Sequence, residues 1–383
     1  MSNASELGVG AASRILYFVA EDWYFVSHRL ALAQEALQRG YKVAVLCRVS
    51  KHKNVIESAG IEVIPLSIDR SDAGLLANAL LFFRVLKIVQ ELGPVVLHNV
   101  AQKPILIGTL VGLMCRVPRI VNAFGGLGTL FSSFSIRSRF ARACLSLFYR
   151  VLFLSKRTHM IVQNNDDKSW IRDGLGVPLT RLSLIRGAGV DIDYYSPNPP
   201  MVAPSAPVIT LVARMLRDKG VVEFCDAVRI LKSRGVAARF WLVGAPDPLN
   251  PSSLTEPELL DFTKIGVEYL GRSNDIKGIW QESDISVLPS YREGLPLSLL
   301  ESAAMGKPIV TTDVPGCREV VDDGVNGFLV PPKDPKALAD AIEKLAVDTD
   351  LRWQFGRASR ERAVKEFSSD RVIADTLTLY EYE

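Results

Sequence analysis

The sequence is poor in the residues that build disulfide frameworks and metal centres. Its 383 residues include five cysteines and four histidines, and no two cysteines stand in CxxC spacing. An odd number of scattered cysteines gives no disulfide framework, and without paired spacing they do not suggest a zinc site. The cysteine content therefore fits a protein of a reducing cytoplasm.

Long apolar segments are also missing. The uncharged run 104–115 stops short of the roughly 20 residues that a membrane-spanning helix needs. The opening residues lack the basic-then-apolar form of a signal peptide. We expect a cytoplasmic protein without a membrane span.

Acidic residues are absent from one extended stretch. Residues 92–165 contain no Asp or Glu, although nine Lys and Arg fall there. Residues 1–200 carry 23 basic and 14 acidic residues, whereas residues 201–383 carry 22 and 28. The first half is therefore expected to meet an anionic partner.

The chain does have a regular alternation of apolar, strand-like segments with helical ones. This alternation predicts parallel sheets with helices on both faces. The length exceeds one typical core, so we expect an α/β protein of two doubly wound domains. The expected strands are residues 14–20, 42–47, 61–65, 95–98, 119–122 and 158–162 in the first half, and 208–213, 239–243, 267–270, 284–289, 308–312 and 326–330 in the second.

A proline-rich segment marks the expected domain boundary, because clustered prolines end regular structure. The expected divisions are a disordered start over 1–13, a first domain over 14–195, a linker over 196–204, a second domain over 205–367, and a C-terminal helix over 368–383 that crosses back to the first domain.

The segment 290–301, SYREGLPLSLLE, is expected to form a strand end, a tight loop and the start of a helix. Pro296 would take the first helical position, so the free N–H groups and the positive end of the helix dipole would point over the loop. Gly294 would let a ligand approach the backbone. This pattern predicts an anion site.

Two carboxylates bracket the predicted anion site. Glu293 lies in the loop, and Glu301 lies on the second turn of the helix. A carboxylate repels phosphate, so both are better suited to accept hydrogen bonds from sugar hydroxyls. A phosphate with hydroxyls on either side is a nucleotide sugar, which we predict as the ligand.

The loop 123–129, AFGGLGT, is a second candidate site. Gly125 and Gly126 follow a strand end, where open α/β sheets bind ligands. A tight turn would also account for them. We favour ligand contact, because adjacent glycines after a strand let the backbone touch a substrate.

Residues 134–157 are expected to form a long helix with a basic side. Arg139, Arg142, Arg150 and Arg157 fall on one side of it, and apolar residues lie opposite. An ordinary core helix with a solvated basic face and a helix on an anionic membrane surface account for this pattern equally well.

Arg214 and Lys219 stand five residues apart in a strand–helix loop. Together with the motif Glu293-Gly-Leu-Pro…Glu301, they make the second half resemble the retaining glycosyltransferases of GT-B fold, family 4. The resemblance covers the chain from the first strand to about residue 367. It implies two Rossmann-like domains facing across a cleft, the nucleotide-sugar donor bound by the second and the acceptor by the first, with no metal and no other cofactor.

The resemblance implies roles for individual residues. Arg214 and Lys219 would grip the donor diphosphate, and two cations suit a departing diphosphate. Glu301 would accept from the ribose and Glu293 from the donor sugar. The implied catalytic residues are Arg214, Lys219 and Glu293; the donor-binding residues also include Gly125, Gly126, Gly271, Arg272, Gly294, Leu295, Pro296, Leu297 and Glu301; the acceptor-binding residues are Trp23, Tyr24, His28, His98 and Asn164.

The chain departs from the family at one place. Many members carry a histidine where Phe124 or Gly125 stands, and without it the loop resembles that of bacterial transferases acting on lipid-diphosphate-linked sugars. Asp191 and Asp193 match the metal-binding Asp-x-Asp of a different transferase fold, but a turn that leads into a linker is the wrong setting for it. We therefore expect no metal.

These patterns predict a bacterial hexosyltransferase of polysaccharide biosynthesis. It would move a hexose or N-acetylhexosamine, with retention and without metal, from a nucleotide sugar, UDP-linked by preference, to a lipid-linked or polysaccharide-precursor acceptor. The expected partners are the donor, the lipid-linked acceptor and the anionic inner face of the cytoplasmic membrane; no nucleic acid is expected.

Two other functions share this fold. A nucleotide-sugar epimerase would need carboxylates or histidines from the first domain, and the acid-free stretch 92–165 counts against it. A catalytically silent module that binds sugar nucleotides is the other, and the presence of Arg214, Lys219, Glu293 and Glu301 counts against silence.

Overall fold

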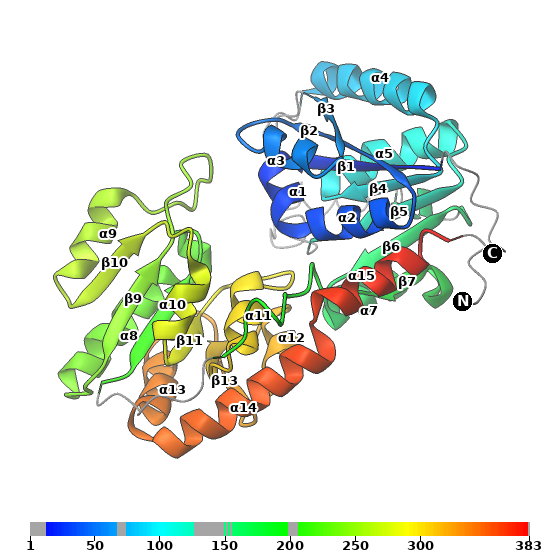
Figure 1. The fold of residues 1–383 in the computed structure, drawn as a ribbon. Coiled ribbons are helices and arrows are strands. Elements are labelled where there is room, and N and C mark those ends of the chain that lie inside the picture. The colour runs from blue at the N-terminus through cyan, green and yellow to red at the C-terminus, as the bar shows by residue number, and fades with distance from the viewer. Residues whose placement is uncertain are drawn as a thin grey trace. The chain divides into compact units, whose positions relative to one another are not determined.

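The computed structural model describes residues 13–66, 74–125, 149–150, 152–153, 155–197 and 206–381. The chain forms two compact units (Figure 1). Unit 1 comprises Met1–Ala188 and Val372–Glu383, and unit 2 comprises Gly189–Arg371. Each unit is an α/β structure built on one parallel sheet, as the alternation of segments predicts.

Unit 1 contains a seven-stranded sheet in the order β3-β2-β1-β4-β5-β6-β7, and its strand pairs are parallel. The order reverses between β1 and β4, and such a switch point is where doubly wound sheets bind ligands. The strands are β1 (Arg14–Glu21), β2 (Lys42–Arg48), β3 (Glu62–Pro65), β4 (Val96–Val100), β5 (Arg119–Ala123), β6 (Thr158–Val162) and β7 (Leu182–Leu184).

Helices cover both faces of this sheet, and β1 shows how the sequence specifies that. Ile15, Tyr17 and Val19 face one apolar cluster, and Leu16 and Phe18 face another, because side chains alternate along a strand. The helices of unit 1 are α1 (Asp22–His28), α2 (Leu30–Gln38), α3 (Lys53–Ser58), α4 (Leu75–Leu92), α5 (Gln102–Met114), α7 (Asn165–Leu175), the short η2 (Leu179–Arg181) and most of α15 (Ser369–Thr378).

Unit 2 contains a six-stranded sheet in the order β10-β9-β8-β11-β12-β13, also with parallel pairs. Its strands are β8 (Val208–Val212), β9 (Arg239–Val243), β10 (Val267–Gly271), β11 (Ile285–Leu288), β12 (Ile309–Thr312) and β13 (Gly327–Val330). Its helices are η3 (Arg217–Lys219), α8 (Val221–Ser233), α9 (Glu256–Thr263), α10 (Ile276–Glu282), α11 (Leu297–Ala304), α12 (Cys317–Val320), α13 (Pro335–Val347) and α14 (Thr349–Glu366).

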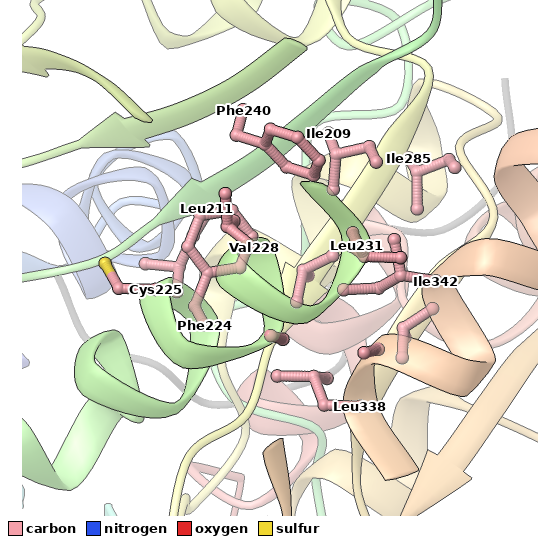
Figure 2. Close-up of a cluster of buried hydrophobic side chains, with 14 of the residues drawn as sticks. Ile209, Leu211, Phe224, Cys225, Val228, Leu231, Phe240, Ile285, Leu338 and Ile342 are labelled. Carbon is pink, nitrogen blue, oxygen red and sulfur yellow. The ribbon is translucent and has the colours of Figure 1, made fainter. Parts of the chain in front are cut away.

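The main core of unit 2 lies between one face of this sheet and the helices α8 and α13. Phe224 and Leu231 of α8 meet Ile209 and Phe240 of the sheet and Ile342 of α13 (Figure 2). A second cluster joins α11, α12 and α14 on the other face. Because helices cover both faces of the sheet, its central strands β8, β11 and β12 are mostly buried and mostly apolar.

The boundary between the units differs from the expected linker. The chain passes from unit 1 to unit 2 between Ala188 and Gly189, whereas the sequence predicts a linker over 196–204. The reason is a backbone pairing: the N–H of Val190 donates to Phe367 O (2.8 Å) and Val190 O accepts from the N–H of Ser369 (2.9 Å). Residues 189–197 are therefore bound into unit 2. The chain returns to unit 1 at Val372, within α15.

Candidate active site

The candidate site of unit 2 is built from loops at the carboxyl ends of β8, β9, β10 and β11. Backbone hydrogen bonds join three of these loops: Ala213 N–H donates to Val243 O (3.0 Å), Met215 N–H to Ala245 O (3.0 Å), and Gly244 N–H to Gly271 O (2.8 Å). A Cβ on Gly244 would lie 1.7 Å from Ala213 O, so this approach requires glycine. The loops thus form one supported edge, where open α/β sheets bind ligands.

Arg214 follows β8 and is about half exposed. Its guanidinium forms an ion pair with Asp247 (Nη1–Oδ2, 2.6 Å). The loop after β9 holds Asp247 in place, because the N–H of Asp247 donates to Ser253 Oγ (2.9 Å). Arg214, which was predicted to bind a diphosphate, is therefore paired with Asp247, a carboxylate that the sequence pattern did not identify.

Lys219 and Glu293 meet, although they come from different loops. Lys219 Nζ lies 2.5 Å from Glu293 Oε1, and Ser290 Oγ donates to the same oxygen (2.7 Å). Both side chains are largely buried, with 21% and 9% of their surface exposed. The approach of the two loops depends on Gly220, where a Cβ would stand 2.1 Å from Pro289 O. The structure thus brings the predicted catalytic residues Lys219 and Glu293 together.

The anion site predicted at the start of α11 is displaced by one residue. Pro296 is the N-cap, with ψ at 115°, and the helix begins at Leu297. The helix starts one residue later than predicted because the backbone of Pro296 is extended rather than helical. Among the described residues, the N–H groups of Leu295, Leu297 and Ser298 have no hydrogen-bond acceptor. These three donors are available to an anion.

Glu301 lies on α11 and accepts a hydrogen bond from the Tyr195 hydroxyl (3.1 Å). Burial raises the pKa of the Glu301 carboxyl to about 7, and the Tyr195 hydroxyl and the Trp280 indole oppose that rise. Arg360 fixes Tyr195 in turn, because its guanidinium donates to the carbonyls of Tyr195 (2.9 Å) and Ala304 (2.8 Å).

Two further donor candidates, Gly271 and Arg272, end β10 at the same edge. Gly271 has a φ of 65°, and nothing lies within 4 Å of its Cβ position. Arg272 is exposed. Sequence reasoning gave no role to Asp247, Ser290 or Tyr195. Ser290 was the first residue of the segment 290–301, and Tyr195 lies in the turn after Asp191, but nothing in the sequence pointed to Asp247.

In unit 1, several of the predicted acceptor residues gather at the carboxyl edge of the sheet. Gly125, which was predicted to bind the donor, follows β5 at this edge, and its Cβ position lies 3.5 Å from the hydroxyl of the predicted acceptor residue Tyr24. Trp23 is 38% exposed, and Tyr24 stacks on His28 with ring centroids 4.1 Å apart. Burial and the charge of Arg29 lower the pKa of His28 to about 4, so its imidazole is neutral near pH 7. Gly126 lies outside the described residues.

The structure gives two predicted acceptor residues structural roles instead. His98 has no exposed surface, and its Nδ1 lies 2.5 Å from the hydroxyl of Tyr380, which the C-terminal segment brings into the core. Asn164 is also fully buried and caps α7: its Oδ1 accepts from Asp167 N–H (2.8 Å), and its Nδ2 donates to Asp167 Oδ2 (3.0 Å). Neither side chain is open to an acceptor.

The helix predicted over 134–157 does not extend to residue 157. Arg139 and Arg142 lie outside the described residues, Arg150 is exposed, and Arg157 stands in a turn just before β6. Because Thr158 N–H bonds back to Ser155 O (3.2 Å), the chain turns there and Arg157 is not part of a continuous helix face. The prediction that four arginines share one helix face is therefore wrong for Arg157.

Asp191 takes part in a turn with Asp193. Asp191 Oδ1 accepts from the N–H groups of Asp193 (3.1 Å) and Tyr194 (2.8 Å), which closes the turn after Val190. Among the described residues no group of three or more metal-ligating side chains is present. In the same part of the chain, no helix combines the length and apolarity that crossing a bilayer requires.

Comparison with known proteins assigns both units to one group of enzymes. The family profile described as "Glycosyl transferase 4-like" matches residues 14–164, and the profile described as "Glycosyl transferases group 1" matches residues 206–348. Two doubly wound units with these matches define the GT-B class of transferase. The chain belongs to glycosyltransferase family 4.

Relatives and a solved structure agree with this assignment. The chain is 26% identical over 365 residues to the N,N'-diacetylbacillosaminyl-diphospho-undecaprenol alpha-1,3-N-acetylgalactosaminyltransferase of Campylobacter jejuni, covering 92% of this chain and 94% of that one. It is 26% identical over 299 residues to the UDP-Gal:alpha-D-GlcNAc-diphosphoundecaprenol alpha-1,3-galactosyltransferase of Escherichia coli, covering 74% of each. Anabaena Alr3699/HepE in complex with UDP and glucose shares the fold, with a TM-score of 0.74 and 21% identity over 96% of this chain and 99% of that one.

Proposed function

We propose that the protein transfers a hexose or N-acetylhexosamine from a UDP-sugar to a sugar attached to a diphosphate lipid, in the synthesis of a bacterial surface polysaccharide. The observation that carries this proposal is the meeting of Lys219 and Glu293, at the same edge of the sheet as Arg214 and the unbonded N–H groups at the start of α11. Relatives of similar length are named for transfer to diphospho-undecaprenol-linked sugars, and one of them for a UDP donor.

The donor diphosphate would lie over the start of α11. Arg214 and Lys219 would neutralise the charge that develops as the nucleotide diphosphate leaves, and the N–H groups of Leu297 and Ser298 would bind its oxygens. Glu293 would accept hydrogen bonds from the donor sugar, and Glu301 from the ribose. With these cations in place, the reaction is proposed to proceed without a metal and with retention at the anomeric carbon.

The acceptor sugar would bind at the carboxyl edge of unit 1. Trp23 and Tyr24 offer aromatic surface beside Gly125, and aromatic side chains suit the apolar face of a sugar ring. The basic stretch 92–165 suits an acceptor diphosphate on an anionic membrane surface. We therefore propose peripheral association with the inner face of the cytoplasmic membrane.

The test is a transfer assay with a polyprenyl-diphosphate-linked sugar and a set of UDP-, GDP- and ADP-sugars, with and without EDTA. Transfer from a UDP-sugar that survives EDTA, with a product of the same anomeric configuration as the donor by NMR, is expected. Transfer only from another nucleotide would overturn the UDP assignment. Complete loss in EDTA that added magnesium restores would overturn metal independence, and an inverted product would overturn retention.

A further inference from the structure

The helix α4 (Leu75–Leu92) exposes large apolar side chains in its first half. Leu76 is 76% exposed, Leu80 65% and Phe83 64%. Spacings of four and three residues place them in one line along the helix. The opposite side buries Leu81 and Val85 against the sheet of unit 1. The first half of α4 is therefore apolar on its solvent side as well as on its core side.

The second half of α4 is an ordinary polar surface. Its exposed residues include Arg84, Lys87 and Glu91, and Lys87 pairs with Glu91 (3.7 Å). The apolar face formed by Leu76, Leu80 and Phe83 is thus bordered by Arg84 and by the Lys87–Glu91 pair. We call these three residues the α4 face.

The α4 face lies toward the ligand-binding edge of unit 1. α4 connects β3 to the parallel strand β4, so it runs back against the strand direction and its first turns lie near the carboxyl ends of the strands. Trp23 and Gly125 follow β1 and β5 at that same edge. An apolar surface here stands at the end of unit 1 where the acceptor is proposed to bind.

We propose that the α4 face inserts into the surface of a phospholipid bilayer and so holds unit 1 beside its lipid-linked acceptor. This inference rests on the proposed function for the nature of the acceptor. A helix that lies in the plane of a membrane buries its apolar face by about 5–10 Å, so the three side chains of the α4 face, which lie on one line along the helix, would enter the bilayer surface together. Arg84 and Lys87 would extend to the headgroups.

The size of the α4 face argues against a second protein chain. Three exposed side chains offer only a few hundred Å², whereas each partner of a stable dimer buries about 800 Å². Binding to a bilayer does not require one large interface, because the free energies of several small contacts with the membrane add together. Asp69 and Asp72 precede α4 in the sequence, outside the described residues, so we expect apolar contact rather than net charge to provide the binding.

The test is flotation with vesicles of phosphatidylcholine and phosphatidylglycerol, at low salt and at about 1 M salt, where charges are screened within about 3 Å. The variant carries Leu80→Gln and Phe83→Gln, since glutamine retains helix propensity. A matched control, Leu260→Gln with Val347→Gln, removes side chains that are 58% and 70% exposed in unit 2. Wild type and control should float at both salt concentrations, and the variant should partition about 10²-fold less, from the loss of two buried side chains.

Three results would overturn the inference. The wild type could fail to bind vesicles at either salt concentration, or it could bind at low salt only, which would assign binding to exposed arginines. The wild type could also form a dimer without lipid that the Leu80→Gln, Phe83→Gln variant dissociates, in which case the α4 face joins two copies of the chain. Circular dichroism and the melting temperature should match between variant and control, and a variant that fails to fold is replaced by Leu76→Gln alone.

A transfer assay with a soluble short-chain acceptor separates this inference from the proposed function. The variant should use that acceptor at close to the wild-type rate, because the α4 face is not assigned to the sugar. If the variant loses this transfer too, the α4 face belongs to the acceptor site and the inference is overturned. If the wild type binds vesicles but transfers no sugar to any acceptor, the proposed function fails while the membrane surface stands.

Discussion

At the scale of single residues, both cations assigned to the diphosphate are held by carboxylates. Arg214 pairs with Asp247 (2.6 Å) and Lys219 with Glu293 (2.5 Å). A diphosphate that binds here has to share or replace these partners. The ion pairs are therefore expected to position the cations in advance, which reduces the entropy that donor binding would otherwise cost.

The first prediction concerns these cations. Arg214→Ala and Lys219→Ala should each lower kcat by roughly 10²-fold or more, because each removes charge stabilisation of the leaving diphosphate. Arg217→Ala is the matched control, since Arg217 is equally exposed but pairs with Glu258. Steady-state kinetics gives the values, and circular dichroism checks folding. Near wild-type turnover in either cation variant would show that the diphosphate binds elsewhere.

The second prediction follows from the pKa of Glu301, which burial raises from 4.5 to about 7. The ionised carboxylate is the form that accepts two ribose hydroxyls, so UDP affinity should fall as the pH drops below about 7, by up to tenfold per pH unit. Calorimetric titration with UDP between about pH 5.5 and 8.5, one and a half units on each side of the pKa of Glu301, measures this change in affinity. Glu301→Gln should remove the part of the pH dependence that has its midpoint near 7, leaving that of the terminal phosphate of UDP, whose second pKa is about 6.

Tyr195 refines that test. Its hydroxyl opposes the rise in the pKa of Glu301, so Tyr195→Phe should move the midpoint of the affinity profile to higher pH. Tyr194→Phe is the control, because Tyr194 is exposed and its ring packs against Lys277. An unchanged midpoint in Tyr195→Phe would show that Glu301 does not control the titration.

The same shift affects stability. The pKa of Glu301 in the folded state lies above its value in the unfolded state, so the contribution of Glu301 to the free energy of unfolding is full below pH 4.5 and is lost as the pH rises through 7.

The pattern of residues 290–301 pointed to Glu293 and Glu301, because residue type and strand–loop–helix spacing are local properties, and the resemblance to a known family pointed to Arg214 and Lys219. Sequence reasoning could not reach Tyr195, which lies 106 residues from Glu301, or Asp247, which lies 33 from Arg214. Nor could it show that Tyr380 would meet His98 in the core, 282 residues away, and so remove a histidine from the candidate acceptor site.

At the scale of elements, the alternation of apolar segments predicted the strands of the described residues except the short β7, because most of these strands are long apolar runs buried in their sheets. The ends of elements were harder to predict. Pro296 precedes α11 instead of opening it, and the chain turns before Arg157, because local hydrogen bonds and backbone angles decide where a helix begins and ends. The loops of unit 2 also depend on glycines that approach backbone atoms of other loops.

The third prediction tests one of those glycines. Gly244→Ala places a Cβ 1.7 Å from Ala213 O, which the backbone cannot accommodate without moving the loop that carries Arg214. Gly235→Ala is the control, because Gly235 also has a positive φ but has nothing within 4 Å of its Cβ position. The control should lose about 1–2 kcal/mol of stability, and Gly244→Ala clearly more, with weaker UDP binding. Denaturant unfolding and calorimetry measure both. Equal losses in the two variants would show that only the backbone angle matters.

At the scale of the whole molecule, the chain passes between the units at two places that lie side by side. Residues 188 and 189 form one crossing, and residues 371 and 372 form the other. The pairing of Val190 with Phe367 and Ser369 joins the segments next to them. The expected linker was placed at 196–204 because of its proline content. Composition could not show that Arg360 donates to the carbonyls of Ile192 and Tyr195 and so binds the turn 191–195 to unit 2.

The last prediction locates the hinge. Excluding water from a donor that is prone to hydrolysis favours closure of the two units on binding, so the radius of gyration should fall when UDP-sugar and an acceptor analogue are both bound. Inserting Gly-Ser within residues 198–204 should leave this compaction and turnover near wild type, because that segment lies inside unit 2. Gly189→Ala should impair compaction and turnover, because its Cβ would lie 2.6 Å from Ser369 Cα and push the two crossing segments apart.

Small-angle scattering and steady-state kinetics measure these effects. Loss of compaction in the insertion variant, with Gly189→Ala unaffected, would return the hinge to the proline-rich segment; an unchanged radius in the wild type with both ligands bound would show that the units do not close.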